Sequence, residues 1–313
     1  MPTATQYFGV AITNLGPLTT TYTAPSSCLT ATTDHIQYAI SGSLEYVIGS
    51  PKCTGDSLGK CIPSGSVLDS MVAERFGRQS GQGFQHYYSP GVYCPHGWTT
   101  AAVLAHGEKT DSVERSGFFT ATANGNWSMP QGMRPDDEWL NILEPSETLA
   151  YCCPSGWTGV VGGNCKTSIE PFESSEFTNA CYEDSPGNDF VTVHTVEGES
   201  WTDSKGILSA MPVTETWPQT TRPFTNAWTQ ETAVVVARNL PAIPLVFKAS
   251  DIESAKKDTK DEKDGDSKGD GKGGSEGVDK NDAASPQPKL LGLAPVAALV
   301  VGVLTGAGLL MPW

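Results

Sequence analysis

Residues 93–99 read YCPHGWT, and residues 152–158 read CCPSGWT. Their shared core, Cys-Pro-x-Gly-Trp-Thr, is an internal repeat. Proline and glycine favour a tight turn, the cysteine can cross-link it, and the tryptophan can cover one side. The repeat therefore predicts a disulfide-stapled turn that the chain uses twice. A tryptophan beside a cysteine in a small disulfide-rich protein usually belongs to the core; the alternative is that Trp98 and Trp157 are exposed and stack on sugar rings.

The cysteines extend this prediction to the rest of the ectodomain. All eight lie between residues 28 and 181: Cys28, Cys53, Cys61, Cys94, Cys152, Cys153, Cys165 and Cys181. An even number in one loop-rich region predicts up to four disulfides and an oxidising compartment. The paired C-x2-C ligands typical of zinc sites do not occur, so we expect no metal. Spacing leaves the pairing open; Cys53–Cys61 and Cys153–Cys165 would close short loops, and we favour them.

The chain from Leu18 to Ser250 predicts a mainly β, irregular ectodomain. The full chain of 313 residues contains 33 glycines and 22 prolines, which favour turns over long helices. Pro244 should place the last strand at a sheet edge, and a short helix is expected at Asp136–Leu143, after Pro135. The segments expected as strands are rich in β-branched or aromatic residues: 19–23, 35–40, 118–122 (with a turn at Asn124-Gly125), 190–196, 232–238 and 243–248.

The composition changes abruptly after residue 250. Residues 251–289 contain eight lysines and eleven acidic residues but no aromatic residue, which predicts a disordered stalk. Residues 290–313, LLGLAPVAALVVGVLTGAGLLMPW, carry no charge. As a hydrophobic helix with a rise of about 1.5 Å per residue, this tail would span a ~30 Å hydrocarbon layer. The predicted segments are an N-terminal segment (1–17), the ectodomain (18–250), the stalk (251–289) and the membrane tail (290–313).

Two kinds of attachment to a lipid bilayer fit the tail. A lasting transmembrane helix usually has basic residues on its cytoplasmic side. No basic residue follows the apolar run 290–313 in this sequence. A glycosylphosphatidylinositol (GPI) signal has small residues at the attachment site, a polar spacer of about 8–12 residues and an apolar tail of about 10–20. Asn281 and Gly273 begin the two candidate attachment sites. We expect the GPI anchor, with a retained transmembrane helix as the alternative.

The evidence on compartment is divided. Residues 1–17 lack a basic region and an unbroken apolar run, so no clear secretory signal peptide is present. The cysteines and the glycosylation sequon at Asn126 favour a secreted ectodomain. A misassigned start, an unconventional export route, or a cytosolic tail-anchored protein with reduced cysteines would each resolve the conflict. We expect an extracellular ectodomain at the cell surface.

Four stretches resemble a family of uncharacterised filamentous-fungal cell-surface and membrane proteins. LTTTYTAPSSC at residues 18–28 resembles the family's LTTTFTPPASC, and YSPGVYCPHGWT at 88–99 resembles its YSPGICPSGYT. CCPSGWT at 152–158 is similar to its CCPSGFT, and AIPLVFKASD at 242–251 to the strand before its linker and membrane segment. The resemblance implies a secreted or membrane-attached, cysteine-stapled ectodomain without assigned catalytic residues. Members commonly continue into a cytoplasmic tail, from which this sequence departs.

Charge and motifs restrict the function further. A net charge of -15 and a pI near 4.7 disfavour nucleic acid as a partner. Residues 136–138, Asp-Asp-Glu, suggest the carboxylate pair of a glycoside hydrolase, but a helix N-terminus explains adjacent acids equally well. His86, His96 and His106 match no zinc spacing. No catalytic residue, cofactor or metal is expected, so we predict a non-enzymatic surface protein; the alternative is a carbohydrate-binding or carbohydrate-active ectodomain that contacts wall polysaccharide.

Overall fold

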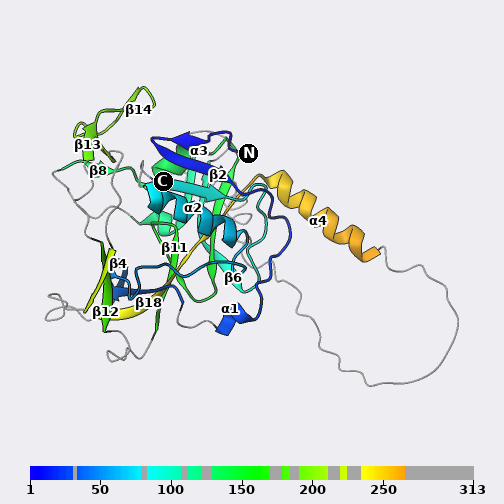
Figure 1. The fold of residues 1–313 in the computed structure, drawn as a ribbon. Coiled ribbons are helices and arrows are strands. Elements are labelled where there is room, and N and C mark those ends of the chain that lie inside the picture. Colours follow the sequence, from blue (N-terminus) through cyan, green and yellow to red (C-terminus); the bar gives the residue numbers. More distant parts are fainter. Residues whose placement is uncertain are drawn as a thin grey trace, which may run out of the picture. The chain divides into compact units, whose positions relative to one another are not determined.

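The computed structural model of the chain describes residues 1–30, 34–78, 83–106, 112–121, 129–169, 178–183, 190–210, 219–223 and 234–264 (Figure 1). Its regular structure is mainly β, and all eight cysteines are joined in four disulfides, so the predicted fold class is confirmed. The chain divides into one unit of residues 1–255 and a second that begins at residue 256. The described part of the second unit is the continuation of helix α4 (Ala249–Asp264).

A four-stranded antiparallel sheet carries most of the core. Its strands, in spatial order, are β19 (Ile243–Phe247), β9 (Thr148–Pro154), β6 (Trp98–His106) and β7 (Val113–Gly117). The interior residues of β9, 149–153, are all buried, because this strand lies between two others and is covered on both faces. β19 is an edge strand, as Pro244 predicts, since proline has no N–H to donate to a further strand.

A second antiparallel sheet has five strands, which in the sequence come before and between the strands of the first sheet. In spatial order it contains β10 (Thr158–Val160), β11 (Asn164–Ile169), β18 (Val234–Pro241), β3 (Ile36–Ile40) and β4 (Ser43–Gly49). The strands predicted at 35–40 and 232–238 correspond to β3 and β18. Only Ala242 separates β18 from β19, and a short turn separates β9 from β10, so the two sheets are joined by two short connections.

Smaller elements surround these sheets in the described residues. The small sheets are β1 (Gln6–Tyr7), β2 (Val10–Asn14) and β5 (Gly83–Tyr87); β12 (Asn179–Glu183) and β17 (Gln219–Pro223); β13 (Phe190–Val193), β16 (Ile207–Ala210) and β8 (Gln131–Gly132); and β14 (Thr195–Val196) with β15 (Glu199–Ser200). β13 and β14 confirm the strand predicted at 190–196 as two short pieces. The helices are α1 (Ser27–Thr30), α2 (Gly65–Arg78), the 3-10 helix η1 (Phe118–Thr120), α3 (Pro135–Ile142) and α4.

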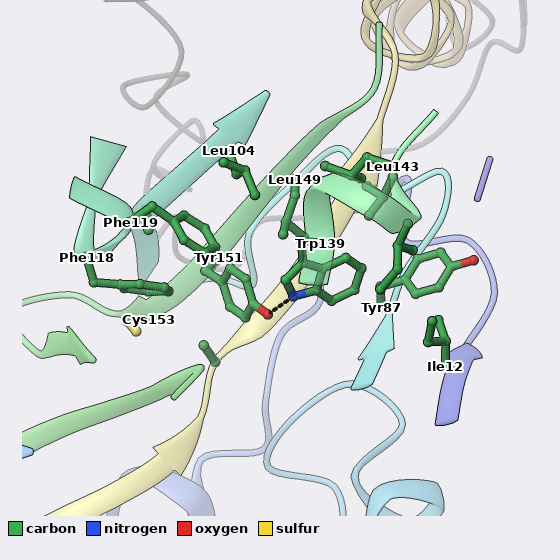
Figure 2. Close-up of a cluster of buried hydrophobic side chains, with 14 of the residues drawn as sticks. Ile12, Tyr87, Leu104, Phe118, Phe119, Trp139, Leu143, Leu149, Tyr151 and Cys153 are labelled. Carbon is green, nitrogen blue, oxygen red and sulfur yellow. Dashed lines mark hydrogen bonds between the residues drawn. The ribbon is translucent and has the colours of Figure 1, made fainter. Parts of the chain in front are cut away.

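Helix α3 confirms the predicted helix and anchors the core. Its Trp139 is fully buried, and the indole Nε1 donates to the hydroxyl of Tyr151 on β9 at 2.8 Å (Figure 2). The ring of Tyr87 from β5 meets the same indole edge-on, with ring centroids 6.0 Å apart. The hydrogen bond satisfies the polar atom of the indole, so the ring can be buried completely. Trp139 thereby joins α3, β5 and β9.

Two predicted strands are wrong. Residues 118–120 form η1, because Gly117 adopts a φ of +60° and turns the chain so that Phe118 and Phe119 enter the core beside Tyr151. Residues 19–23 form no strand: Thr19–Thr21 are exposed, so their β-branched side chains line no buried sheet face. The turn predicted at residues 124–125 lies outside the described residues.

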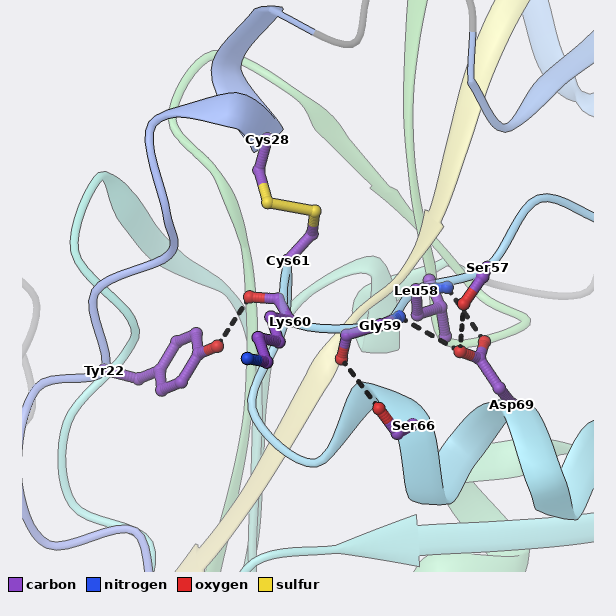
Figure 3. Close-up of a disulfide and its surroundings, with 9 residues drawn as sticks. All are labelled: Tyr22, Cys28, Ser57, Leu58, Gly59, Lys60, Cys61, Ser66 and Asp69. Atoms are coloured by element: carbon purple, nitrogen blue, oxygen red, sulfur yellow. Dashed lines mark hydrogen bonds between the residues drawn. A yellow bond between two sulfur atoms is a disulfide. The ribbon is translucent and has the colours of Figure 1, made fainter.

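Helix α2 was missed by the sequence analysis, and the loop before it is held by side chains. The Asp69 carboxylate of α2 accepts hydrogen bonds from the backbone N–H groups of Leu58 (2.8 Å) and Gly59 (3.0 Å) and from the Ser57 hydroxyl (Figure 3). Burial raises the pKa of Asp69, but these three hydrogen bonds outweigh it and lower the pKa below its usual value. The loop is thus fixed by one ionised carboxylate.

Two peripheral disulfides tie the same loop to the rest of the fold. Cys28 pairs with Cys61, just before α2 (Figure 3), and Cys53 pairs with Cys181 on β12. The predicted pairing Cys53–Cys61 is therefore wrong. Cys61 bonds to a cysteine of α1, and Cys53 bonds to a cysteine of β12. The two bridges therefore close long loops rather than one short loop. The predicted pairing of Cys153 with Cys165 is confirmed.

Helix α4 changes the expected start of the stalk. Residues 251–264 are helical, whereas the charge-rich composition predicted a disordered segment from residue 251. The Asp251 carboxylate accepts from the backbone N–H of Lys248 at 2.8 Å, which caps the first turn. The rest of the predicted stalk and the predicted hydrophobic helix at 290–313 lie outside the described residues. Among the helices that the structure describes, none is both long and apolar enough to cross a membrane.

Candidate functional site

The repeated motif forms the same turn twice. In each copy the backbone N–H of the tryptophan donates to the proline carbonyl three residues earlier, Trp98 to Pro95 and Trp157 to Pro154, both at 3.0 Å. The glycine before each tryptophan has a positive φ, +79° in the first copy and +84° in the second. A glycine with positive φ at the third position defines a type II turn. The prediction of one turn used twice is confirmed.

The fold brings the two turns together. Trp98, the first residue of β6, lies opposite Pro154, the last residue of β9. The backbone N–H and the hydroxyl of Ser155 both donate to the Gly97 carbonyl at 2.9 Å. We call residues 95–99 and 154–158 together the twin-turn surface. Two segments that are far apart in the sequence thus form one continuous surface at the end of the four-stranded sheet.

Two disulfides of strand β9 stiffen the twin-turn surface. Cys152 and Cys153 are consecutive residues of β9, so their side chains point to opposite faces of the sheet. Cys152 bonds to Cys94, just before the first turn, and Cys153 bonds to Cys165 on β11 of the five-stranded sheet. Cys152, Cys153 and Cys165 are at most 1% exposed. The adjacent cysteines therefore anchor one turn to the other and one sheet to the other.

The two tryptophans are half-buried. Both rings pack against the main hydrophobic core, as their expected structural role requires. The guanidinium of Arg238 lies 5.3 Å from the ring centroid of Trp157, which covers part of that ring. The remaining part of each ring is at the surface, beside four exposed neutral or weakly basic residues of the twin-turn surface: His96, Ser155, Thr99 and Thr158. The arrangement joins aromatic area to hydrogen-bonding groups on a rigid support.

Two of the three acidic residues at the start of α3 contact other side chains of the fold. Asp136 accepts from Arg134 Nε at 2.9 Å and from Arg115 Nε at 3.3 Å. Glu138 is 6% exposed, accepts from Gln85 Nε2 at 3.3 Å, and has a buried Oε1 without a hydrogen-bond partner. Burial raises the pKa of Glu138. These contacts agree with the structural interpretation of the acids, because Asp136 is held between two arginines at the helix start.

The three evenly spaced histidines lie in different places. His96 is exposed on the twin-turn surface, whereas His86 and His106 lie on β5 and β6. The Nε2 atom of His86 is buried without a hydrogen-bond partner, and burial lowers the pKa of this residue to about 4. Within the described ranges, no group of three or more His, Cys, Asp or Glu side chains can hold a metal ion. The candidate sites Asn126, Gly273 and Asn281 lie outside the described residues.

Sequence reasoning missed two parts of the site, Arg238 and the bond between Cys94 and Cys152. Arg238 reaches Trp157 only because β18 pairs with β11, and residue spacing carries no signal for that pairing. The bond from Cys94 to Cys152 likewise follows from the pairing of β6 with β9. Comparisons with protein families, with curated proteins and with solved structures found no match for this chain.

Proposed function

We propose that this chain is a non-enzymatic protein of the cell surface. Its disulfide-cross-linked β unit lies outside the cell, and its C-terminal apolar tail attaches it to the membrane. The observation that carries the proposal is the pairing of all eight cysteines. The Cα atoms of the four pairs are 4.8 to 5.7 Å apart, within the range that disulfides adopt. Such bridges persist in oxidising compartments and are rare in the cytosol.

The mode of attachment is part of the same proposal. Residues 290–313 carry no charge, and small residues precede them at Gly273 and Asn281, which is the pattern of a GPI signal. In that case the apolar tail is removed, and the lipid of the GPI anchor inserts into the bilayer in its place. The net charge of -15 supports this, because anionic headgroups repel such a protein and only apolar insertion can hold it.

Phospholipase release tests the topology and the anchor together. A tag placed after Gly265 lies directly beyond α4 and before both candidate attachment residues, so it stays on the mature protein and leaves the helix intact. Treating intact cells with phosphatidylinositol-specific phospholipase C should release the tagged chain into the medium. The variants Asn281→Arg and Gly273→Arg identify the attachment residue, since only small residues are accepted there.

The other outcomes are equally specific. Retention on the membrane, with the tag accessible outside intact cells, would replace the GPI anchor by a transmembrane helix and keep the extracellular placement. A tag that antibodies reach only after permeabilisation would overturn the extracellular placement and favour a cytosolic tail-anchored protein. A chain that ends at Lys289 is the control, because it lacks the apolar tail and should not be attached to the membrane at all.

A second candidate function, carbohydrate binding, is favoured by the bonds from Ser155 to the Gly97 carbonyl, which bring the two tryptophan-bearing turns side by side. Aromatic rings stack on the apolar faces of sugars, and neighbouring hydroxyl and imidazole groups hydrogen-bond the sugar hydroxyls. Because the protein is strongly acidic, the ligand we propose is a neutral wall polysaccharide such as a glucan or chitin.

Tryptophan fluorescence tests this second candidate. Adding glucan or chitin oligosaccharides should change the emission of the native chain, and the Trp98→Ala and Trp157→Ala variants should lose most of the response. Trp201→Ala is the matched control, because Trp201 packs in a separate cluster with Phe8 and Ile207. An unchanged emission with every glycan, or an equal response from all variants, would remove carbohydrate binding at this surface and leave the surface-protein proposal untouched.

A further inference from the structure

One face of the five-stranded sheet is polar. In an antiparallel pair, residues opposite each other share a face, as do alternate residues along one strand. The register places Lys166 of β11 opposite Asn239 of β18, and Ala237 of β18 opposite Gln37 of β3. Lys166, Asn239 and Gln37 therefore stand on the same face, together with Ala237 and Ala39. We call this the polar face of the sheet.

The polar atoms of this face are buried, although Gln37 and Asn239 as whole residues are half-exposed. Lys166 is 5% exposed, Ala39 0% and Ala237 1%. Polar and charged side chains are seldom buried unless they are paired, so this face requires compensating interactions. The opposite face, which carries Tyr38 and Val236, is an ordinary apolar core.

The burial follows from a strong curl of the sheet. The Lys166 ammonium donates to the Leu44 carbonyl of β4 at 2.9 Å, although β18 and β3 lie between β11 and β4. Neighbouring strands are about 4.8 Å apart, so a flat sheet would hold β4 about 14 Å from β11, beyond the reach of one lysine side chain. β4 also pairs irregularly with β3, and such bulges increase twist and bending. The polar face is therefore the concave side of a curled sheet.

The concave side has both hydrogen-bond donors and hydrogen-bond acceptors without partners. An ammonium has three donors, and Leu44 accepts one of them. Two buried oxygens on the same face, Asn239 Oδ1 and Gln37 Oε1, have no hydrogen-bond partner. Nearly all buried polar atoms in proteins are satisfied by protein or by water. Burial lowers the pKa of Lys166, and the charge of Glu45 opposes this shift only in part, so further hydrogen-bond acceptors would favour the cationic form.

We propose that ordered water molecules lie on the concave side of this sheet and bridge the Lys166 ammonium to the amide oxygens of Gln37 and Asn239. The network then joins one residue from each of four neighbouring strands, β11, β18, β3 and β4. The small side chains of Ala39 and Ala237 leave room between the polar groups, and a buried water needs two to four such partners.

The chemistry of the face selects water over other occupants. A cation would be repelled by the ammonium. An anion would be attracted by the ammonium, but it cannot donate a hydrogen bond to either amide oxygen and would leave both unsatisfied. An apolar molecule would leave all three groups unsatisfied. A small neutral molecule that both donates and accepts hydrogen bonds satisfies the lysine donors and the amide acceptors together, and water is the available molecule of this kind.

The sign of a stability change tests the proposal. In the full chain, Asn239→Leu removes an acceptor from the network and should lower the melting temperature by about 2–10 °C. If the Asn239 oxygen were simply unpaired, a leucine of similar size would leave the melting temperature unchanged or raise it, and the proposal would be overturned. Asn179→Leu is the control, because this asparagine is exposed on β12 and its replacement should have little effect.

Direct detection of the water keeps the test valid if Asn239→Leu fails to fold. A high-resolution crystal structure of the unmodified chain should show ordered water within hydrogen-bond distance of Lys166 Nζ and at least one of the two amide oxygens. Lys166→Met should lose that water, since the central donor is gone. An unmodified protein without ordered water at these atoms would contradict the proposal.

Discussion

Replacing Gly117 with alanine should destabilise the fold more than replacing Gly97 with alanine, although both glycines have a positive φ, +60° and +79°. The left-handed helical conformation costs an L-residue about 1–2 kcal/mol, and Gly117, with a ψ of −138°, lies outside that region, so an alanine there costs at least as much. A Cβ at Gly97 meets nothing within 4 Å. A Cβ at Gly117 would overlap the Ala101 carbonyl oxygen and lie 2.7 Å from Ala102 Cα, so the backbone of β6 has to move.

The difference between the two variants can be estimated from that clash. Forcing extra atoms into a packed interior costs about 1–3 kcal/mol, so Gly117→Ala should lower the free energy of unfolding by about 2–5 kcal/mol in total. Gly97→Ala should lower it by about 1–2 kcal/mol. Urea unfolding followed by fluorescence measures both. Equal losses for the two variants would refute the close approach of Gly117 to β6, and with it the reason that residues 118–120 leave the sheet.

Three further results follow from the buried and bridged groups. The pKa of His86 is lowered from 6.5 to about 4, so the unfolded chain binds the proton first; stability should be complete above about pH 6.5 and fall between pH 6.5 and 4. The urea midpoint should lose part of this dependence in His86→Phe but not in His96→Gln; an unchanged profile in His86→Phe would contradict the burial. Under mild reduction with timed alkylation and mass spectrometry, Cys28–Cys61 and Cys53–Cys181, which are half-exposed, should open before Cys153–Cys165; the reverse order would be inconsistent with their burial. Asp69→Ala removes three hydrogen bonds and should lower the free energy of unfolding by about 1–3 kcal/mol, whereas a neutral result in thermal unfolding would show that the loop before α2 is held by its disulfide alone.

Local chemistry made part of the fold predictable from the sequence. The twin turns follow from proline and glycine at fixed positions, the start of α3 from Pro135, and the edge position of β19 from Pro244. The short loop between Cys153 and Cys165 predicted their bridge correctly, whereas the same reasoning failed for Cys53 and Cys61. In each case the deciding interaction lies within a few residues of the motif.

The remaining features depend on contacts between distant segments. Cys94 meets Cys152 only after β6 pairs with β9, and Arg238 meets Trp157 only after β18 pairs with β11. The polar face depends on register in the same way, because Lys166 and Asn239 become neighbours only in the sheet. Residues 19–23 show the opposite failure, since β-branched side chains predicted a strand that tertiary contacts do not form.

The extracellular placement of the β unit is tested most directly by labelling thiols on cells that express the full chain. A membrane-permeant alkylating reagent is added without reductant, and the purified chain is then digested and analysed by mass spectrometry. We expect no labelled cysteine and four cross-linked peptide pairs, Cys28–Cys61, Cys53–Cys181, Cys94–Cys152 and Cys153–Cys165. Alkylation of all eight cysteines would mean that the chain resides in a reducing compartment, and it would contradict the proposed surface location.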